Sequence, residues 1–233
     1  EHFRHKISVI HDGIDTDLIR PTNEQVITLP DGDQVGSADE VITYVGRSLE
    51  PYRGFHSFMR SLPKILKQRK DAVVLIVGSE GISYGGEPPA GHSWKSLFLK
   101  EIRSLLNNQQ YERIKFVGMV DYSAFRQILC VSTVHVYLTY PFVLSWSLLE
   151  AMASGCAIVG SRTPPVEEVI EDNKTGRLVD FFDYEEIALN VVELLENSEK
   201  RVMLGRHARE LVRESYDLKT RCLPKQILWA EAL

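Results

Sequence analysis

Two arginines on one short segment are well suited to bind an anion. Arg47 and Arg53 lie in the stretch GRSLEPYRG, residues 46–54, between an apolar run and a helix-period segment. Arginine stays protonated and presents planar, two-pronged donors that match phosphate oxygens. Gly46 and Gly54 allow the backbone to approach a ligand closely. The pattern favours a phosphate site, and two solvated arginines on a surface loop are the alternative that the local sequence leaves open.

A second candidate anion site follows the apolar run VHVYL, where a helix is expected to begin near Ser145. We expect the Ser145 hydroxyl to accept a hydrogen bond from a first-turn amide. Free amides at Ser145 and Trp146, with the helix dipole behind them, favour an anion. Each such contact contributes only about 0.3–1 kcal/mol when exposed. A diphosphate would therefore need these amides together with both arginines.

Glu150 lies about one and a half turns into the same predicted helix. Its neighbours in sequence are apolar, and a carboxylate is costly to bury without hydrogen-bond partners. The two hydroxyls of a ribose would be suitable donors to Glu150. A structural salt bridge or a solvent-facing side chain is the alternative.

Short apolar runs alternate with amphipathic segments along the whole chain. The predicted strands are residues 41–45, 72–77, 114–117, 134–138, 157–160 and 177–179. The predicted helices are residues 55–66, 145–154, 184–195 and 199–214. Unbroken apolar strands that alternate with helices indicate βαβ units and a parallel sheet covered on both faces. The sequence thus predicts an α/β fold with a Rossmann-like, doubly wound sheet, which binds ligands at the carboxyl ends of its strands.

Two stretches interrupt this alternation. Residues 25–35 predict a two-stranded hairpin across the turn Pro30-Asp31-Gly32-Asp33. Residues 78–93 hold five glycines and two prolines and follow a predicted strand. They predict a long loop, which is either a mobile active-site element or a solvated surface insertion.

The bulk properties exclude several classes of protein. The chain has 233 residues and a formal net charge of −5, so nothing global attracts a nucleic acid. No apolar run is long enough for a transmembrane segment. Two Asp-x-Asp pairs, at 15–17 and 31–33, fall in segments where turns are expected, and the histidines show no ligand spacing. We therefore predict no metal site.

Three motifs in order resemble the C-terminal, donor-binding domain of family-four retaining glycosyltransferases with the GT-B fold. Residues 6–17 (KISVIHDGIDTD) resemble the interdomain segment of that family. GRSLEPYRG is similar to its Gly-Arg…Lys-Gly loop, with Arg53 in place of lysine. Residues 147–179 are similar to its most recognisable stretch. The resemblance implies that residues 1–20 are an interdomain segment from a missing N-terminal domain, and that residues 21–233 bind the donor.

The resemblance also implies roles for single residues. Arg47 and Arg53 would be catalytic, because they neutralise the diphosphate of a nucleotide-sugar donor. The amides near Ser145 and Trp146 would hold its phosphates, and Glu150 would bind the ribose. One further donor-binding position would be Gly46, in the segment of residues 46–54 that carries the two arginines. The others would lie at the edge of the base pocket: Phe116, Val117 and Gly118.

The implied activity is sugar transfer with retention of anomeric configuration, without a bound metal or cofactor. A carbohydrate or glycolipid acceptor would bind the missing N-terminal domain of the same polypeptide, so the fragment alone would be inactive. The family implies polysaccharide biosynthesis at a cytoplasmic location, with the full-length protein either free or peripheral at the membrane.

One departure affects the donor sugar. The family has two glutamates separated by seven residues, and Phe142 stands where the first, sugar-contacting glutamate is expected. A non-catalytic nucleotide-sugar-binding or scaffold domain therefore remains the alternative function. An epimerase of the same fold would need catalytic carboxylates or histidines in this half, and a dehydrogenase would need a Gly-x-Gly-x-x-Gly turn that the sequence lacks.

Overall fold

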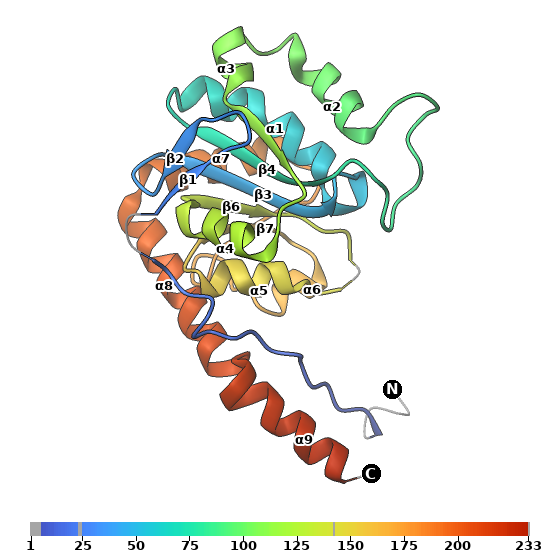
Figure 1. The fold of residues 1–233 in the computed structure, drawn as a ribbon, viewed down its shortest axis with the longest axis vertical. Coiled ribbons are helices and arrows are strands. Elements are labelled where there is room, and N and C mark those ends of the chain that lie inside the picture. Colours follow the sequence, from blue (N-terminus) through green and yellow to red (C-terminus); the bar gives the residue numbers. More distant parts are fainter. Residues whose placement is uncertain (1–5, 23–24, 142, 233) are drawn as a thin grey trace.

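A parallel sheet forms the centre of the molecule. The computed structural model describes residues 6–22, 25–141 and 143–232. Within them, six strands are ordered β5-β4-β3-β6-β7-β8, and every neighbouring pair is parallel (Figure 1). The strands are β3 (Val41–Ser48), β4 (Val73–Ser79), β5 (Ile114–Gly118), β6 (Val134–Tyr137), β7 (Ala157–Ser161) and β8 (Arg177–Val179). The predicted Rossmann-like, doubly wound parallel sheet is confirmed.

The strand order reverses between β3 and β6. From β3 the chain runs outward through β4 to β5, and from β6 it runs outward in the other direction through β7 to β8. At such a switch point the loops that leave the two central strands turn to opposite faces, which opens a crevice at the carboxyl ends. Arg47 lies at the carboxyl end of β3 and not in a loop, Arg53 lies a few residues after that strand, and the segment before Ser145 follows β6. The topology thus places both predicted anion sites at this crevice.

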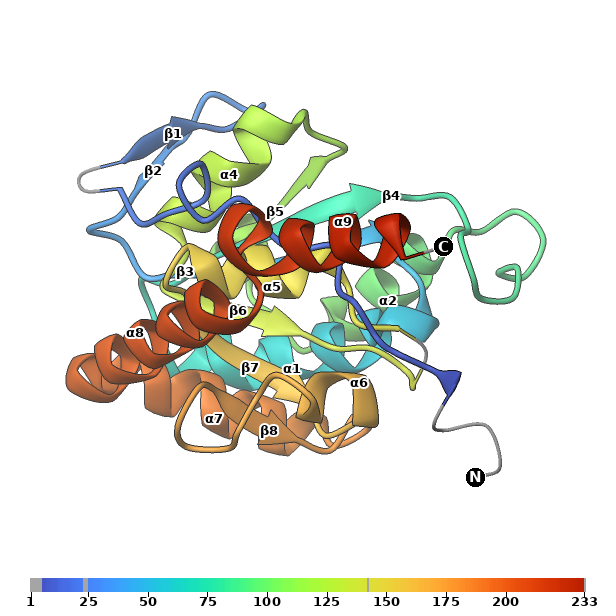
Figure 2. The same ribbon diagram turned by 90° about the horizontal axis from the view of Figure 1, so that it is seen from below.

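Helices cover both faces of the sheet (Figures 1 and 2). They are α1 (Phe55–Gln68), α2 (Trp94–Arg103), α3 (Asn108–Glu112), α4 (Tyr122–Val131), α5 (Trp146–Ala153), α6 (Pro164–Glu167), α7 (Tyr184–Glu196), α8 (Ser198–Ser215) and α9 (Leu223–Glu231). Two shorter turns are the 3-10 helix η2 (Pro51–Arg53) and the π-helix η3 (Leu218–Cys222). The four predicted helices agree with α1, α5, α7 and α8 to within two residues at each end.

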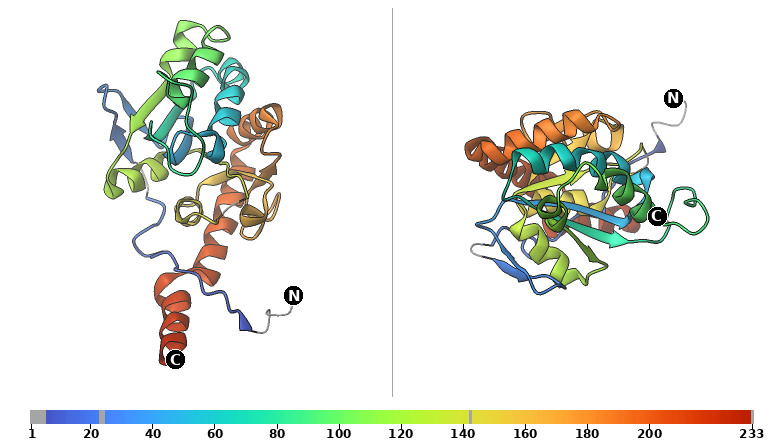
Figure 3. Two further views of the ribbon diagram at one scale, coloured as in Figure 1. Left: turned by 90° about the vertical axis from the view of Figure 1, so that its right-hand side faces the viewer. Right: turned by 90° about the horizontal axis from the view of Figure 1, so that it is seen from above.

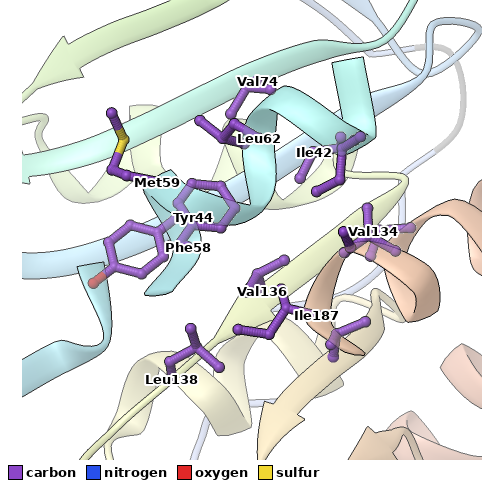
Figure 4. Packing of buried hydrophobic residues seen from close by; sticks show 14 of the residues in the cluster. Ile42, Tyr44, Phe58, Met59, Leu62, Val74, Val134, Val136, Leu138 and Ile187 are labelled. Carbon is purple, nitrogen blue, oxygen red and sulfur yellow. The ribbon is translucent and has the colours of Figure 1, made fainter. Parts of the chain in front are cut away.

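Alternate residues of the central strands face different helices. Ile42 and Tyr44 of β3 pack with Val134 and Val136 of β6 against α1 and α7, as Figure 4 shows. Val41 of β3 belongs instead to the cluster that includes the hairpin and α4. Burial on both faces explains why these strands are unbroken apolar runs.

The hairpin and the N-terminal segment are attached to the rim of this core. Strands β1 (Val26–Thr28) and β2 (Gln34–Gly36) pair antiparallel, which confirms the predicted hairpin. The segment before it runs beside α8 and α9, which extend away from the sheet (Figure 3). Ile14 forms a bridge with Asp217, and the Thr16 hydroxyl donates to Asp217 at 2.6 Å. None of the described helices is long and apolar enough to cross a membrane.

Candidate functional site

A cleft of about 750 Å³ opens at the switch point between β3 and β6. Five of the predicted site residues line it together: Gly46, Arg47, Arg53, Ser145 and Trp146. The other walls come from β3, β4 and the loop after it, the loop after β5, α4, the end of β6 and α5: Val45, Val77, Tyr84, Met119, Val120, Tyr122, Phe125, Tyr137, Leu138 and Ser147. One cleft therefore holds both arginines and the start of α5.

Neither arginine of the cleft has an acidic partner in the part of the chain that the structure describes. Arg47 is exposed and Arg53 is half-buried, and neither forms an ion pair with a described carboxylate. Arg53 instead donates from Nη1 to Thr139 Oγ1 at 3.1 Å, and its guanidinium lies 5.0 Å from the centre of the Tyr84 ring. Two cations without acidic partners in one cleft create a site that favours an anion.

The backbone around Arg53 is held by close packing. Gly54 has φ +72°, and a side chain there would overlap the Cβ of Leu138. Only glycine adopts this left-handed conformation at little cost, so the loop turns sharply into α1. The Tyr44 hydroxyl donates to the Arg53 carbonyl at 2.7 Å. These contacts fix where Arg53 leaves the backbone.

The start of α5 differs in one detail from the prediction. Ser145 is the N-cap residue, but its hydroxyl caps no amide of the helix. It pairs instead with the Ser147 hydroxyl at 2.9 Å, so the prediction of a side-chain cap was wrong. The amides of Trp146 and Ser147 have no hydrogen-bond partner among the described residues. An uncapped first turn leaves these amides available to a ligand oxygen.

Trp146 is 61% exposed and lies at the rim of the cleft. Its indole Nε1 donates to Asp12 Oδ2 at 3.0 Å, which ties the start of α5 to the N-terminal segment. The side chain is therefore oriented by a residue that lies 134 positions earlier in the chain.

Glu150 is buried in α5 and accepts a hydrogen bond from the Tyr122 hydroxyl at 2.8 Å. Burial raises the pKa of the Glu150 carboxyl, and the bond from Tyr122 opposes that rise. The carboxylate forms none of the described salt bridges, so the salt-bridge alternative does not hold. Tyr122 lines the cleft while Glu150 lies behind it. A ribose that reaches Glu150 must share the carboxylate with Tyr122 or displace it.

The residues predicted at the base pocket lie one step away from the cleft. Phe116 and Val117 line two smaller neighbouring pockets of about 320 and 330 Å³, and Gly118 lines the smaller one. The following residues, Met119 and Val120, reach the main cleft itself. The loop after β5 therefore reaches the cleft through Met119 and Val120, which directly follow the three predicted residues.

The sequence analysis missed two residues of the site region. Glu50, between the two arginines, is fully buried and accepts backbone hydrogen bonds from Ser83, Tyr84 and Gly85. Tyr84 lines the cleft, so the glycine-rich loop, residues 78–93, contributes to the site. No periodicity marks either residue, because both lie in irregular segments and their roles depend on how two loops meet.

Each of the two Asp-x-Asp pairs forms ion pairs with a lysine. Lys115 contacts both Asp31 and Asp33, at 2.8 and 2.6 Å. Lys219 contacts Asp15 and Asp17 at 3.1 and 2.9 Å. Within the described part of the chain, no group of three or more His, Cys, Asp or Glu is arranged to hold a metal ion. Phe142, predicted to replace a sugar-contacting glutamate, lies outside the described residues.

The reversed strand order and the cleft at the carboxyl ends define a Rossmann-like α/β domain of the GT-B type. The chain belongs to the family of glycosyl transferases group 1, whose model matches residues 31–211. This membership confirms the resemblance seen in the motifs.

Known proteins agree with this assignment. The chain is 28% identical over 179 residues to an uncharacterized glycosyltransferase of Methanocaldococcus jannaschii, covering 76% of this chain and 42% of that protein. It is 27% identical over 212 residues to spore coat protein SA of Bacillus subtilis, covering 88% and 54%. It therefore spans about half the length of these curated relatives.

Two solved structures share the fold. The C-terminal domain of a glycosyl transferase group 1 family protein from Francisella tularensis superimposes with a TM-score of 0.72 at 20% identity, covering 89% of this chain and all of that one. Anabaena HepE, in complex with UDP and glucose, has a TM-score of 0.73 at 19% identity, covering 97% and 56%.

Proposed function

We propose that this chain is the donor-binding half of a retaining glycosyltransferase that uses a nucleoside diphosphate sugar. The observation that carries the proposal is the convergence of Arg47, Arg53 and the uncapped start of α5 on one cleft. Residues 1–20 are then the link to an N-terminal half that binds a carbohydrate or glycolipid acceptor. The UDP and glucose bound by the structurally similar Anabaena protein are consistent with such a ligand.

The site residues suit the departure of a diphosphate. When the bond between the anomeric carbon and the diphosphate oxygen breaks, its electron pair stays with the leaving diphosphate. Arg47, Arg53 and the α5 amides stabilise the charge that builds there, and such preorganised electrostatic stabilisation is often the largest contribution to catalysis. The acceptor hydroxyl forms the new bond on the same face of the sugar, and its proton leaves with the diphosphate. We propose that this transfer needs no bound metal.

The binding site can be tested on the chain alone. Calorimetry with uridine, guanosine and adenosine diphosphates should find at least one ligand. Arg47→Ala and Arg53→Ala should each weaken that ligand by about 10- to 100-fold, because a charge-assisted contact contributes about 1.5–3 kcal/mol. Arg206→Ala is the matched control, since Arg206 is an exposed arginine of α8. Equal affinities for all four proteins would place the ligand elsewhere.

A second candidate function is nucleotide-sugar binding without transfer. Phe142 in the sequence favours it, because phenylalanine cannot accept a hydrogen bond from a donor sugar. Assay of the full-length protein with acceptor separates the two functions. Sugar transfer supports the enzyme, and tight binding without transfer supports the binding domain.

A further inference from the structure

Glu50 is a buried carboxylate whose hydrogen-bond partners are all backbone amides of one turn. Its side chain is 0% exposed. Its Oε2 atom accepts from the amides of Ser83 and Gly85 at 3.2 and 3.0 Å, and the Tyr84 amide is shared between Oε1 at 3.2 Å and Oε2 at 3.4 Å. None of the described cations forms a salt bridge with it. A buried charge needs such partners, and a turn of successive amides forms a concave site for an anion.

The turn that Glu50 holds carries one wall of the donor cleft. Tyr84 lines the cleft, and the guanidinium of Arg53 lies 5.0 Å from the centre of its ring. The Nη1 atom of Arg53 also donates a hydrogen bond to Thr139 Oγ1 at 3.1 Å. The position of the guanidinium thus depends on Tyr84, and the position of Tyr84 depends on Glu50.

A row of three serine hydroxyls provides a second connection between the glycine-rich loop and the end of β3. The Ser83 hydroxyl donates to Ser48 Oγ at 2.6 Å, and the hydroxyls of Ser48 and Ser79 lie 3.2 Å apart. Ser79 then donates to the Arg47 carbonyl at 2.9 Å. The glycine-rich loop is therefore connected to the backbone of one arginine and to the side chain of the other.

We propose that Glu50 is a positioning residue for the diphosphate site: by holding the turn at residues 83–85 it keeps Tyr84 against Arg53. The proposal rests on the proposed function, because it assumes that Arg53 contacts the diphosphate. It assigns the glycine-rich loop to the donor site. It also explains why a carboxylate lies between two arginines without pairing with either.

Glu50→Gln tests this role with little change of volume. A glutamine has one acceptor oxygen, so with that oxygen at the Oε2 position it can keep the bonds from Ser83 and Gly85. It then presents an NH₂ group where the Tyr84 amide has its shorter contact and leaves that amide only the 3.4 Å contact. We expect hydrogen exchange at the Tyr84 amide to accelerate and nucleoside diphosphate affinity to fall, each by about tenfold, as loss of one charge-assisted bond predicts. Affinity for the nucleoside without phosphates should stay within about twofold, because the proposed site places the phosphates, and not the nucleoside, at Arg53.

Two variants of Tyr84 show whether the effect passes through the ring. Tyr84→Phe keeps the aromatic face, so it should lose less nucleoside diphosphate affinity than Tyr84→Ala. Tyr84→Ala should reproduce the loss seen in Glu50→Gln, because an arginine–ring contact contributes about 0.5–2 kcal/mol. Asp217→Asn is the matched control for removing a carboxylate charge, since Asp217 is buried and accepts bonds from Thr16 and Thr220, outside the cleft.

The outcomes separate this inference from the function on which it rests. A wild-type chain that binds no nucleoside diphosphate would overturn the proposed function and the inference with it. Wild-type binding that Glu50→Gln leaves unchanged would overturn the inference alone. So would a loss in Asp217→Asn as large as that in Glu50→Gln, because the effect would then reflect general destabilisation.

Discussion

Arg47 and Arg53 form no ion pair with a described residue, whereas five other described arginines do. Arg60, for example, is paired with Glu101, and Arg177 with Glu193. Exposed ion pairs contribute little to stability, so acidic partners for the cleft arginines would hardly stabilise the fold. They would also compete with an anionic ligand for the two guanidinium groups. The absence of such partners around the two cleft arginines is therefore what a phosphate site requires.

Glu150 should make the site sensitive to the ribose. We predict that the wild-type chain binds a nucleoside diphosphate at least about tenfold more tightly than its 2′-deoxy analogue, because a hydroxyl donates to a carboxylate. In Glu150→Gln this preference should shrink, since the charge is lost while the volume is kept. Calorimetry on both ligands measures it. Glu199→Gln, at an exposed position of α8, is the control. An unchanged preference in Glu150→Gln would remove Glu150 from the ribose site.

His135 should make the fold sensitive to acid. Burial lowers its pKa from the ordinary 6.5 to about 4, and its Nδ1 lies 2.8 Å from Thr43 Oγ1 while Nε2 has no partner. Between about pH 6.5 and pH 4, the His135 imidazole is therefore protonated in the unfolded chain but neutral in the folded chain. Stability should fall as the pH drops from about 6.5 to about 4, by at most about 3 kcal/mol from this residue.

Urea unfolding at pH 7 and pH 4.5 measures this loss. His135→Gln should reduce the difference between the two pH values, and His92→Gln, at an exposed position, should leave it as in the wild type. His56, whose pKa burial also lowers to about 4, contributes in the same window and is unchanged in both variants. An undiminished acid loss in His135→Gln would contradict this assignment.

At the scale of elements, helix α8 approaches the backbone closely at one glycine. A Cβ at Gly205 would overlap the carbonyl oxygen of Gly155, just after α5. Helix propensity alone predicts that Gly205→Ala stabilises the protein by about 0.8–1 kcal/mol. Overpacking a dense interior costs about 1–3 kcal/mol, and the rigid carbonyl has little room to move. We therefore predict a net loss of about 1–2 kcal/mol.

Urea unfolding of Gly205→Ala checks which effect is larger. Val202→Ala, one turn earlier at an exposed position of α8, gains propensity without a clash and should not lose stability. Nucleoside diphosphate affinity should be the same in both variants, because the contact lies away from the cleft. A stability of Gly205→Ala equal to or above that of the wild type would refute the close packing.

The elements that sequence predicted well share a strong local signal. Strand β3 is an unbroken apolar run, and α1 has an apolar stripe over three turns. Helix α2 was missed because it buries only Phe98 and Ile102. Helix α4 was missed because its buried residues begin only at Phe125, so its apolar stripe covers little more than its second half. Helix α9 was missed because it buries none of its side chains, so no stripe identifies it.

Sequence reasoning found the residues that meet at the cleft where they lie in motifs, as with Arg47, Arg53 and Ser145, while their roles stay predictions. The site was not predictable where two distant segments meet. The bond from Tyr122 to Glu150 joins residues 28 positions apart and depends on how α4 packs against α5. The contact of Trp146 with Asp12 spans 134 positions. Such pairs follow from the packing of whole elements, which local spacing does not encode.

At the scale of the whole molecule, a second large groove offers a contrast. It has a volume of about 700 Å³ and lies between the loop after β7 and helix α8. Its lining is acidic on balance, with five glutamates and Asp172 against Arg162 and Lys174. The glutamates are Glu167, Glu168, Glu171, Glu210 and Glu214. Like charges repel, so a diphosphate should avoid this groove and choose the cleft with the two arginines.

The location of a bound nucleoside diphosphate tests the central claim most directly. A crystal structure of the chain, soaked with whichever diphosphate binds in calorimetry, shows that location without assumptions about catalysis. We predict that the phosphates lie between the guanidinium groups of Arg47 and Arg53 and the first turn of α5, with the ribose at Glu150. Phosphates seated in the acidic groove, or on any other face of the sheet, would contradict the account.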